Sequence, residues 1–268
     1  MNKKFSLIIF TDLDGSLLHR DNFKFDEIKD YIKSLIDEGI IIIPNTSKTE
    51  KETVDFLNEL GSELPFISEN GSVINGLNLL KKDLPQKLIL GRDKSELLKI
   101  FNKEVPKNLI IKCKWLYLMN KDIQTNILGL SKDSLRLALD RKFTIPFVFE
   151  GTKNEKIELN KILKVKGLTL QEGGRVINLC DNVSKAKAMK IFLRFLKKNK
   201  KELKSIAVGD NYNDLDMLKN ADIACLVFND QFKQDQIHLD NLIVSNKPSP
   251  EGWADVIKMA LAKLNYKY

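Results

Sequence analysis

Short, fully apolar runs alternate with amphipathic segments over residues 5–68 and again over residues 185–264 of this 268-residue chain. The runs include "FSLIIFT", "IIIIP" and "KSIAVGD", and the segments between them carry apolar residues at helical spacing. Strands that are apolar on both faces belong to a parallel sheet covered by helices on both sides. The two ends of the chain therefore predict one α/β domain with a doubly wound, Rossmann-like parallel sheet.

The pattern changes in the middle of the chain. Helical segments such as "RDKSELLKIFNKEV" alternate there with partly polar strands such as "KGLTLQEGG". Helices with partly exposed strands are typical of an α+β unit. We expect residues 1–80 and 177–268 to form the core and residues 81–176 to form an inserted α+β domain, with hinges near 76–83 and 171–176.

Polar side chains follow the apolar runs, where the strands of the predicted sheet end. They are Asp12 and Asp14 after the first run, Thr46, Ser47 and Lys48 after "IIIIP", Asp210, Asn213 and Asp214 after "SIAVG", and Lys185 at the start of a helix. Ligands of open parallel sheets bind beyond the carboxyl ends of the strands. These side chains are therefore expected to converge on one site.

The chemistry that suits this set is phosphoryl transfer. Asp12 can attack phosphorus to form an aspartyl phosphate, and Asp14 can protonate the leaving oxygen and later activate water. Carboxylates that face a phosphate need a hard cation such as Mg²⁺, for which Asp210 is a third anion. Thr46 and Lys185 can stabilise charge on the phosphoryl oxygens.

Each of these features also has a purely structural interpretation. The aspartates and Gly15 suit a plain turn, "NTS" suits a helix N-cap, and "GDNYND" suits a capped surface turn. Lys185 and Lys187 suit a solvated helix face. All four features nevertheless occur in order at predicted strand ends or helix starts, which favours a shared site and leaves only Lys187 undecided.

Charge and cysteine usage limit the partners of the chain. The formal charge is +8, but the lysines are dispersed, and the densest run, "KKNKK" at 197–201, follows a helical segment where cations are expected. This argues against nucleic acid and suits an anionic small molecule. No apolar stretch reaches the roughly 20 residues of a membrane helix. The scattered Cys113, Cys180 and Cys225 suggest core thiols, and we expect a cytoplasmic protein that does not bind membranes.

Four motifs resemble those of the haloacid dehalogenase superfamily of phosphatases: "DLDGS", "NTSKT", "SKAKA" and "GDNYND". The long insertion is similar to the cap of its sugar-phosphatase branch. Within that branch the chain most resembles the mannosyl-3-phosphoglycerate phosphatase family, on the basis of "TSKT", "PFISENGSVI", "GGR" and "SPEGWADVI".

The resemblance implies a role for each matching residue. Mg²⁺ would be bound by Asp12, by Asp210 and by the backbone carbonyl of Asp14. Lys185 or metal-bound waters would be positioned by Asn213 and Asp214. The substrate would be met by Ser47, Lys48, Glu69, Asn70 and Arg175. Glu69 and Asn70 also suit a strand-ending turn. Arg175 also suits a surface charge in a hairpin.

The resemblance implies a Mg²⁺-dependent phosphatase that converts mannosyl-3-phosphoglycerate to mannosylglycerate and phosphate. Other sugar phosphates remain open as substrates, including sucrose phosphate, glucosyl-3-phosphoglycerate and hexose phosphates. A phosphohexomutase also remains open, and a noncatalytic binder of phosphorylated ligands is disfavoured because binding alone needs no nucleophile beside an acid. The sequence leaves the oligomeric state open.

Overall fold

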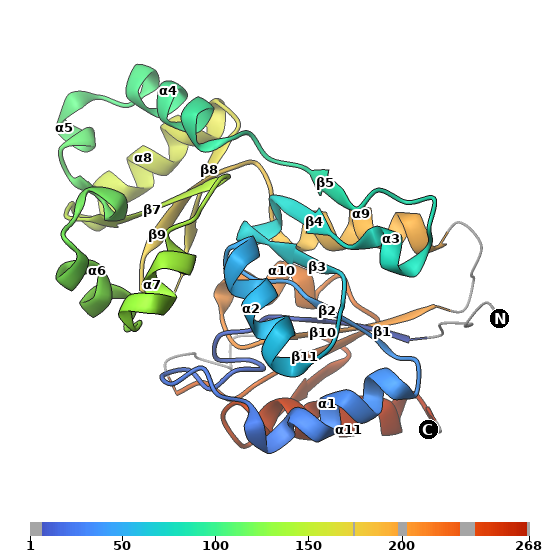
Figure 1. Ribbon diagram of the computed structural model, residues 1–268. Coiled ribbons are helices and arrows are strands. Elements are labelled where there is room, and N and C mark those ends of the chain that lie inside the picture. Colours follow the sequence, from blue (N-terminus) through green and yellow to red (C-terminus); the bar gives the residue numbers. More distant parts are fainter. Residues whose placement is uncertain (1–6, 174, 198–202, 231–238, 267–268) are drawn as a thin grey trace.

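A parallel sheet forms the centre of the larger of two units in the computed structural model, which describes residues 7–173, 175–197, 203–230 and 239–266 (Figure 1). Its five strands lie in the order β12-β11-β10-β1-β2. They are β1 (Leu7–Thr11), β2 (Ile41–Pro44), β10 (Lys204–Gly209), β11 (Ile223–Leu226) and β12 (Leu242–Val244). All neighbours pair in parallel, which confirms the predicted doubly wound core.

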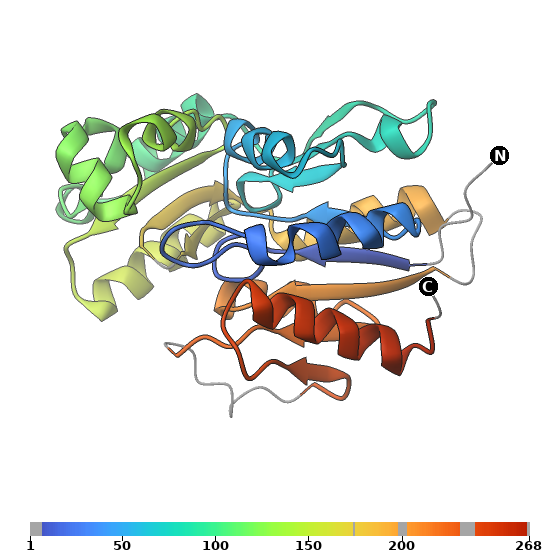
Figure 2. The ribbon, with the colours of Figure 1, turned by 60° about the horizontal axis from the view of Figure 1, so that its bottom comes forward.

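Helices cover both faces of this sheet. One face packs against α1 (Asp26–Asp37), α2 (Glu50–Leu60) and α11 (Glu251–Lys263), and the other packs against α9 (Lys185–Lys197) and α10 (Leu215–Leu218). Figure 2 shows α1 and α11 side by side across the first face. Side chains alternate along a strand, so Leu7 and Ile9 join the first layer, whereas Ile8 and Phe10 join the second.

The strand order reverses between β1 and β10. The chain passes from β1 to β2 on one side and later returns to place β10 on the other side of β1. Thr11 lies beside Val208 in the register, so the loops that leave β1 and β10 begin next to each other. A crevice at such a reversal is the usual ligand site of a doubly wound sheet.

An antiparallel hairpin sheet borders the core. It contains β3 (Phe66–Ser68), β4 (Val73–Asn75) and β5 (Lys87–Ile89), with η1 (Glu69–Gly71) between β3 and β4 and α3 (Leu77–Leu80) after β4. A bridge between Asn45 and Ile67 joins β3 to β2. Residues 87–89, which the sequence assigned to the insertion, therefore pair with the core side.

The inserted unit, called the cap below (residues 92–181), has an antiparallel sheet in the order β6-β7-β9-β8. Its strands are β6 (Cys113–Trp115), β7 (Thr144–Phe149), β8 (Leu168–Glu172) and β9 (Ile177–Asp181). Its helices are α4 (Lys94–Glu104), α5 (Lys107–Ile110), η2 (Leu116–Leu118), α6 (Lys121–Leu128), α7 (Lys132–Ala138) and α8 (Lys153–Val165). Residues 177–181 were assigned to the core by sequence, but β9 pairs with β7 and β8.

The two connections between core and cap lie side by side. Arg92, on the outgoing connection, donates from Nε and Nη2 to the two carboxylate oxygens of Asp181, on the returning one, over 2.9 and 2.7 Å. The backbone N–H of Leu90 donates to the carbonyl of Ser72, which fastens the outgoing connection to the core. These two connections between core and cap therefore lie later in the chain than the hinges expected near 76–83 and 171–176.

Three further expectations concern thiols, membranes and charge. Cys113, Cys180 and Cys225 are buried and form no disulfide, as predicted. In the described part of the chain, no helix is both long and apolar enough to span a bilayer. Residues 198–201 of the lysine-rich run lie outside the described residues.

Candidate active site

Asp12 and Asp14 lie on the loop that leaves β1, at the reversal of strand order. The backbone N–H of Asp12 donates to the carbonyl of Val208 on β10 over 2.9 Å, so the loop begins by following the sheet. Gly15 then turns the chain at φ +80°, and a Cβ at this position would lie 2.7 Å from Oδ2 of Asp210. The glycine of "DLDGS" is therefore required for this loop to approach the end of β10.

Asp12, Asp210 and Asp214 form a buried carboxylate cluster. One oxygen of each carboxylate lies within 4.8 Å of those of the other two. Burial raises the pKa of Asp12 to about 7 and that of Asp210 to about 6, since Lys185 and Arg20 offset only part of the cost of holding the charges. Burial also raises the pKa of Asp214. Closely spaced carboxylate oxygens are the ligands that Mg²⁺ prefers, so the cluster fits this ion.

Lys185 is the cation that holds the cluster together. Its Nζ lies 2.8 Å from Oδ1 of Asp12 and 2.8 Å from Oδ1 of Asp214, and the residue is only 3% exposed. Burial opposes the charge, but the two carboxylates outweigh it and raise the pKa of Lys185. Oδ2 of Asp214 accepts the backbone N–H groups of Asp210 and Asn211 over 3.2 and 3.3 Å. Asp214 thus fixes the lysine against the end of β10.

The start of α9, and with it Lys185, is placed by the turn of η1. Gly71 lies at φ +92°, and a Cβ there would lie 2.3 Å from the carbonyl oxygen of Ser184. Only glycine permits this approach. The side chain of Asn45 adds a hydrogen bond of 3.1 Å to the carbonyl of Lys185.

The loop after β2 contributes Thr46, Ser47 and Lys48. The hydroxyl of Thr46 accepts the N–H of Lys48 over 3.2 Å, which leaves its own proton available to a ligand. Nζ of Lys48 lies 3.0 Å from Oδ1 of Asp14 and 3.5 Å from Oε1 of Glu52. Burial alone would lower the pKa of Lys48, but these two carboxylates raise it. The side chain of Asp14 thus faces Lys48 rather than the carboxylate cluster.

Glu69 and Asn70 lie at η1, away from the cavity lining. The Glu69 carboxylate accepts the backbone N–H groups of Lys142 and Phe143, both over 3.0 Å, and the hydroxyl of Thr144 over 2.7 Å. All three donors belong to the cap. Glu69 therefore joins the cap to the core, and the N–H of Asn70 donates to the carbonyl of Thr46 over 3.0 Å, which supports the loop after β2.

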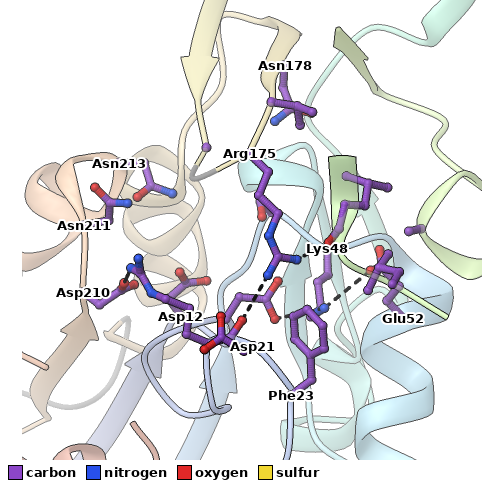
Figure 3. A pocket seen from close by; sticks show the side chains of 18 of the residues that line it. Asp12, Asp21, Phe23, Lys48, Glu52, Arg175, Asn178, Asp210, Asn211 and Asn213 are labelled. Atoms are coloured by element: carbon purple, nitrogen blue, oxygen red, sulfur yellow. Dashed lines mark hydrogen bonds and ion pairs between the residues drawn. The ribbon is translucent and has the colours of Figure 1, made fainter. Parts of the chain in front are cut away.

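A cavity of about 380 Å³ lies between core and cap (Figure 3). The core lines it with Asp12, Asp14, Arg20, Asp21, Phe23, Ser47, Lys48, Glu52, Asp210, Asn211 and Asn213, and the cap with Leu128, Leu130, Ala138, Arg141, Gly173, Arg175, Val176 and Asn178. The volume is within the usual range of small-molecule sites, roughly 300–1,000 Å³. Its carboxylates and cations together suit a substrate that is both charged and polar.

Arg175 reaches from the cap across this cavity, as Figure 3 shows. Its Nη2 donates to the carbonyl of Arg20 over 3.2 Å, and its Nη1 donates to the carbonyl of Leu128. The guanidinium carbon lies 5.3 Å from the centre of the Phe23 ring, and Nζ of Lys48 lies 4.7 Å from the same ring. Phe23 thus contacts both cations that the sequence analysis assigned to the substrate.

Several cavity residues were missed by the sequence analysis. Arg20 donates to Oδ2 of Asp210 over 2.8 Å, and Arg141 donates to the carbonyl of Ser47 over 3.0 Å. Arg20 follows Asp12 closely on a loop at the same sheet edge, a signal that could have been used. Arg141 and Asn178 come from the cap, and their place depends on how the cap sits on the core.

The raised pKa values predict that the metal-free protein loses stability as the pH rises. The folded protein holds the protons of Asp12 and Asp210 up to about pH 7 and 6, whereas an unfolded chain releases them near pH 4. The free energy of unfolding therefore falls between about pH 4 and 7. In EDTA, we expect a lower melting temperature at pH 8 than at pH 5.5, and a smaller difference for Asp12→Asn.

The control for this prediction is Asp216→Asn, which changes an exposed carboxylate on α10 outside the cluster. It should keep the wild-type pH dependence in a thermal-melt series. Equal pH dependence of Asp12→Asn and Asp216→Asn would contradict the prediction.

The chain is similar to known proteins in sequence and in fold. Residues 9–233 match the family model described as haloacid dehalogenase-like hydrolase. A glucosyl-3-phosphoglycerate/mannosyl-3-phosphoglycerate phosphatase from Persephonella marina is 31% identical over 261 residues, which cover 94% of this chain and 96% of the relative. A mannosyl-3-phosphoglycerate phosphatase from Pyrococcus horikoshii is 31% identical over 232 residues, which cover 82% and 90%.

A solved structure shares the fold at low sequence identity. It is a phosphatase of the haloalkanoate enzyme superfamily from Bacteroides thetaiotaomicron, with a TM-score of 0.69, 15% identity and coverage of 96% of each chain. This similarity supports the core-and-cap architecture. The family match over residues 9–233 confirms the superfamily predicted from the four motifs, and the chain belongs to the haloacid dehalogenase-like hydrolases.

Proposed function

We propose that this protein is a Mg²⁺-dependent phosphatase that hydrolyses mannosyl-3-phosphoglycerate or glucosyl-3-phosphoglycerate through an aspartyl phosphate. The observation that carries the proposal is the position of Asp12. It lines the cavity at the reversal of strand order, paired with Lys185 and next to Asp210 and Asp214. The names of the relatives from Persephonella marina and Pyrococcus horikoshii support the substrate.

In the first step, a carboxylate oxygen of Asp12 attacks phosphorus and the bond to the leaving oxygen breaks. Asp14 gives its proton to that oxygen, and its position beside Lys48 in the cavity orients it for this role. Lys185 and the hydroxyl of Thr46 stabilise the charge that spreads over the phosphoryl oxygens. Asp12 and Asp210 would hold Mg²⁺ together with the backbone carbonyl of Asp14, with Asp214 in support, and the ion would neutralise phosphate charge.

In the second step, water attacks phosphorus and the bond to Asp12 breaks. Asp14, now ionised, takes a proton from this water, and inorganic phosphate leaves. The acid of the first step is thus regenerated. Closure of the cavity by the cap excludes other water while the acyl phosphate exists.

The substrate part of the proposal agrees with the charges of the cavity. A glycosyl-3-phosphoglycerate carries a phosphate, a carboxylate and a sugar, so its site needs cations beyond those that serve the phosphoryl group. Lys48 is largely balanced by Asp14 and Glu52. Arg175 and Arg141 from the cap, and Arg20 from the core, are the other cations of the lining. A guanidinium suits a carboxylate because both are planar and can form two parallel hydrogen bonds.

A phosphate-release assay tests the proposal. Purified protein should release phosphate from both glycosyl-3-phosphoglycerates with Mg²⁺ and lose this activity in EDTA. It should show a higher kcat/KM for these compounds than for hexose 6-phosphates or sucrose phosphate. Comparable turnover of the simple sugar phosphates would overturn the substrate assignment, and Mg²⁺-independent turnover would overturn the mechanism.

Arg175→Ala is expected to lower this preference by about tenfold, because a site that pairs with the substrate carboxylate discriminates against compounds that lack it. The matched control is Arg136→Ala, which changes an exposed arginine on α7 of the cap. The measurement is the ratio of kcat/KM for mannosyl-3-phosphoglycerate to that for glucose 6-phosphate. An unchanged ratio in Arg175→Ala would show that Arg175 does not contribute to substrate recognition.

A further inference from the structure

Asn178 is a buried side chain whose carbonyl oxygen lacks a hydrogen-bond partner. It is 4% exposed, and its Oδ1 is buried without a hydrogen bond. Among the described residues, no hydrogen bond from its Nδ2 is found either. A buried polar group without a partner typically costs about 1–3 kcal/mol. Such a group in a folded protein requires an explanation, and a ligand is one.

The position of Asn178 points to the cavity. Along β9, Ile177 and Leu179 pack into the cap core with α4 and α8, so Asn178 faces the opposite side of the sheet. That side faces the catalytic core, and Asn178 lines the cavity there (Figure 3). Its neighbours across the sheet form no hydrogen bond with it. The side chain of Pro146 has no polar atom, and the side-chain amide of Gln171 donates to the carbonyl of Val183.

The side-chain carboxamide of Asn178 is suited to form hydrogen bonds with hydroxyl groups. A carboxamide presents one acceptor and two donors without charge, which matches sugar hydroxyls, since each hydroxyl both donates and accepts. The charged parts of the substrate have other partners, namely Arg141 and Arg175 of the cavity lining for a carboxylate, and Lys185, which lies beside Asp12, for the phosphoryl group. Leu128, Leu130 and Val176 add apolar surface from the cap, which suits the C–H face of a sugar ring.

We propose that Asn178 is a specificity-determining residue that hydrogen-bonds hydroxyls of the glycosyl unit when the substrate is bound. This proposal rests on the function proposed above. It assigns the sugar end of the substrate to the inner face of the cap sheet, whereas the phosphoryl group lies at Asp12. The partnerless amide is then satisfied by the substrate, so a substrate without a sugar leaves it unpaired.

The test compares two substrates that differ only in the sugar. Glycosyl-3-phosphoglycerate and 3-phosphoglycerate share the phosphate and the carboxylate, and a phosphate-release assay gives kcat/KM for each. Asn178→Leu keeps the number and branching of the side-chain heavy atoms and removes the hydrogen-bonding groups. We expect it to lower kcat/KM at least tenfold more for the glycosylated substrate than for 3-phosphoglycerate.

The matched control is Asn75→Leu. Asn75 is another buried asparagine of the described chain with a partnerless Nδ2, but it lies on β4 and outside the cavity lining. Asn75→Leu should leave the ratio of the two kcat/KM values at its wild-type level. The melting temperature of Asn178→Leu should equal or exceed that of the wild type, because a partnerless amide is replaced by an apolar group with the same branching.

The outcomes separate this proposal from the proposed function. An equal loss on both substrates, or a lowered melting temperature with parallel loss of activity, would assign Asn178 a structural role and overturn the inference. A wild-type enzyme that prefers another sugar phosphate would overturn the proposed substrate alone. Asn178→Leu would then be assayed on that compound and on p-nitrophenyl phosphate, with the same tenfold criterion. A wild type without preference for any sugar-bearing phosphate would overturn both proposals.

Discussion

Asp12→Asn is expected to abolish turnover and leave the fold intact. The amide has nearly the volume of the carboxylate but cannot attack phosphorus, so the covalent route is lost. Removing a nucleophile raises the barrier by several kcal/mol, and a loss of about 4 kcal/mol already corresponds to roughly a thousandfold in rate. We expect kcat to fall by at least this factor in a phosphate-release assay with Mg²⁺.

The fold should tolerate Asp12→Asn because it removes a negative charge from a crowded cluster. Lys185 keeps its ion pair with Asp214, and Arg20 keeps its ion pair with Asp210. The melting temperature in EDTA at pH 8 should therefore equal or exceed that of the wild type.

A trapping experiment gives an independent readout of the same role. Wild-type protein denatured in acid during turnover of ³²P-labelled substrate should carry label that hydroxylamine removes, as expected for an acyl phosphate. The Asp12→Asn protein should carry none, and the exposed-site control Asp216→Asn should behave like the wild type. A clean preparation of Asp12→Asn that retains near-wild-type turnover would remove Asp12 from the nucleophilic role.

The parts of the structure that the sequence predicts well are those set by local pattern and strand order. The apolar runs that become β1, β2 and β10 are buried on both faces, and a parallel sheet follows from that pattern alone. The carboxyl ends of parallel strands share one edge, so Asp12 and Asp210 could be expected together although 198 positions separate them along the chain. Lys185 could be expected at the same edge from its place at a helix start.

The boundaries of the cap were harder to predict, since they depend on long-range pairing. The run at 177–181 alternates apolar and polar residues, and nothing local shows whether it joins the core or an antiparallel partner. Its pairing with β7 and β8 places it in the cap. Residues 87–89 present the same ambiguity, because their partner is β4 of the hairpin and not a cap strand.

Side chains at the contact between core and cap were predicted least well. Glu69 was expected near the substrate, yet its carboxylate accepts donors from Lys142, Phe143 and Thr144 of the cap. Sequence motifs show that an acid is present but not which donors the cap will bring to it. Asn178 and Arg141 escaped notice for the same reason.

Lys185→Met is expected to lower both activity and stability. Methionine keeps much of the length of the side chain but leaves Asp12 and Asp214 buried without the cation that lies 2.8 Å from each. Removing one partner of a buried ion pair typically costs about 3–5 kcal/mol, because the remaining charge stays buried and uncompensated. We expect a loss of this order in the free energy of unfolding, measured in urea at pH 8 with EDTA.

The pH and metal dependence identify the cause of this loss. At pH 5.5 Asp12, whose pKa burial already raises to about 7, binds a proton, so the destabilisation of Lys185→Met should shrink. Mg²⁺ at pH 8 should also reduce it if the cluster binds the ion, whereas turnover should stay low because the phosphoryl oxygens have lost a fixed donor.

The matched control is Lys187→Met, two residues further along α9. Lys187 is exposed, and its Nζ donates to the carbonyl of Asn182 over 2.8 Å, away from the carboxylate cluster. A surface change of this kind stays within about 0.5 kcal/mol and should leave turnover intact. If Lys185→Met proved as stable as Lys187→Met at pH 8 in EDTA, the lysine would not be what compensates the buried carboxylates. A fully active Lys185→Met would in turn remove Lys185 from phosphoryl transfer, since no other described lysine lies within ion-pair distance of Asp12.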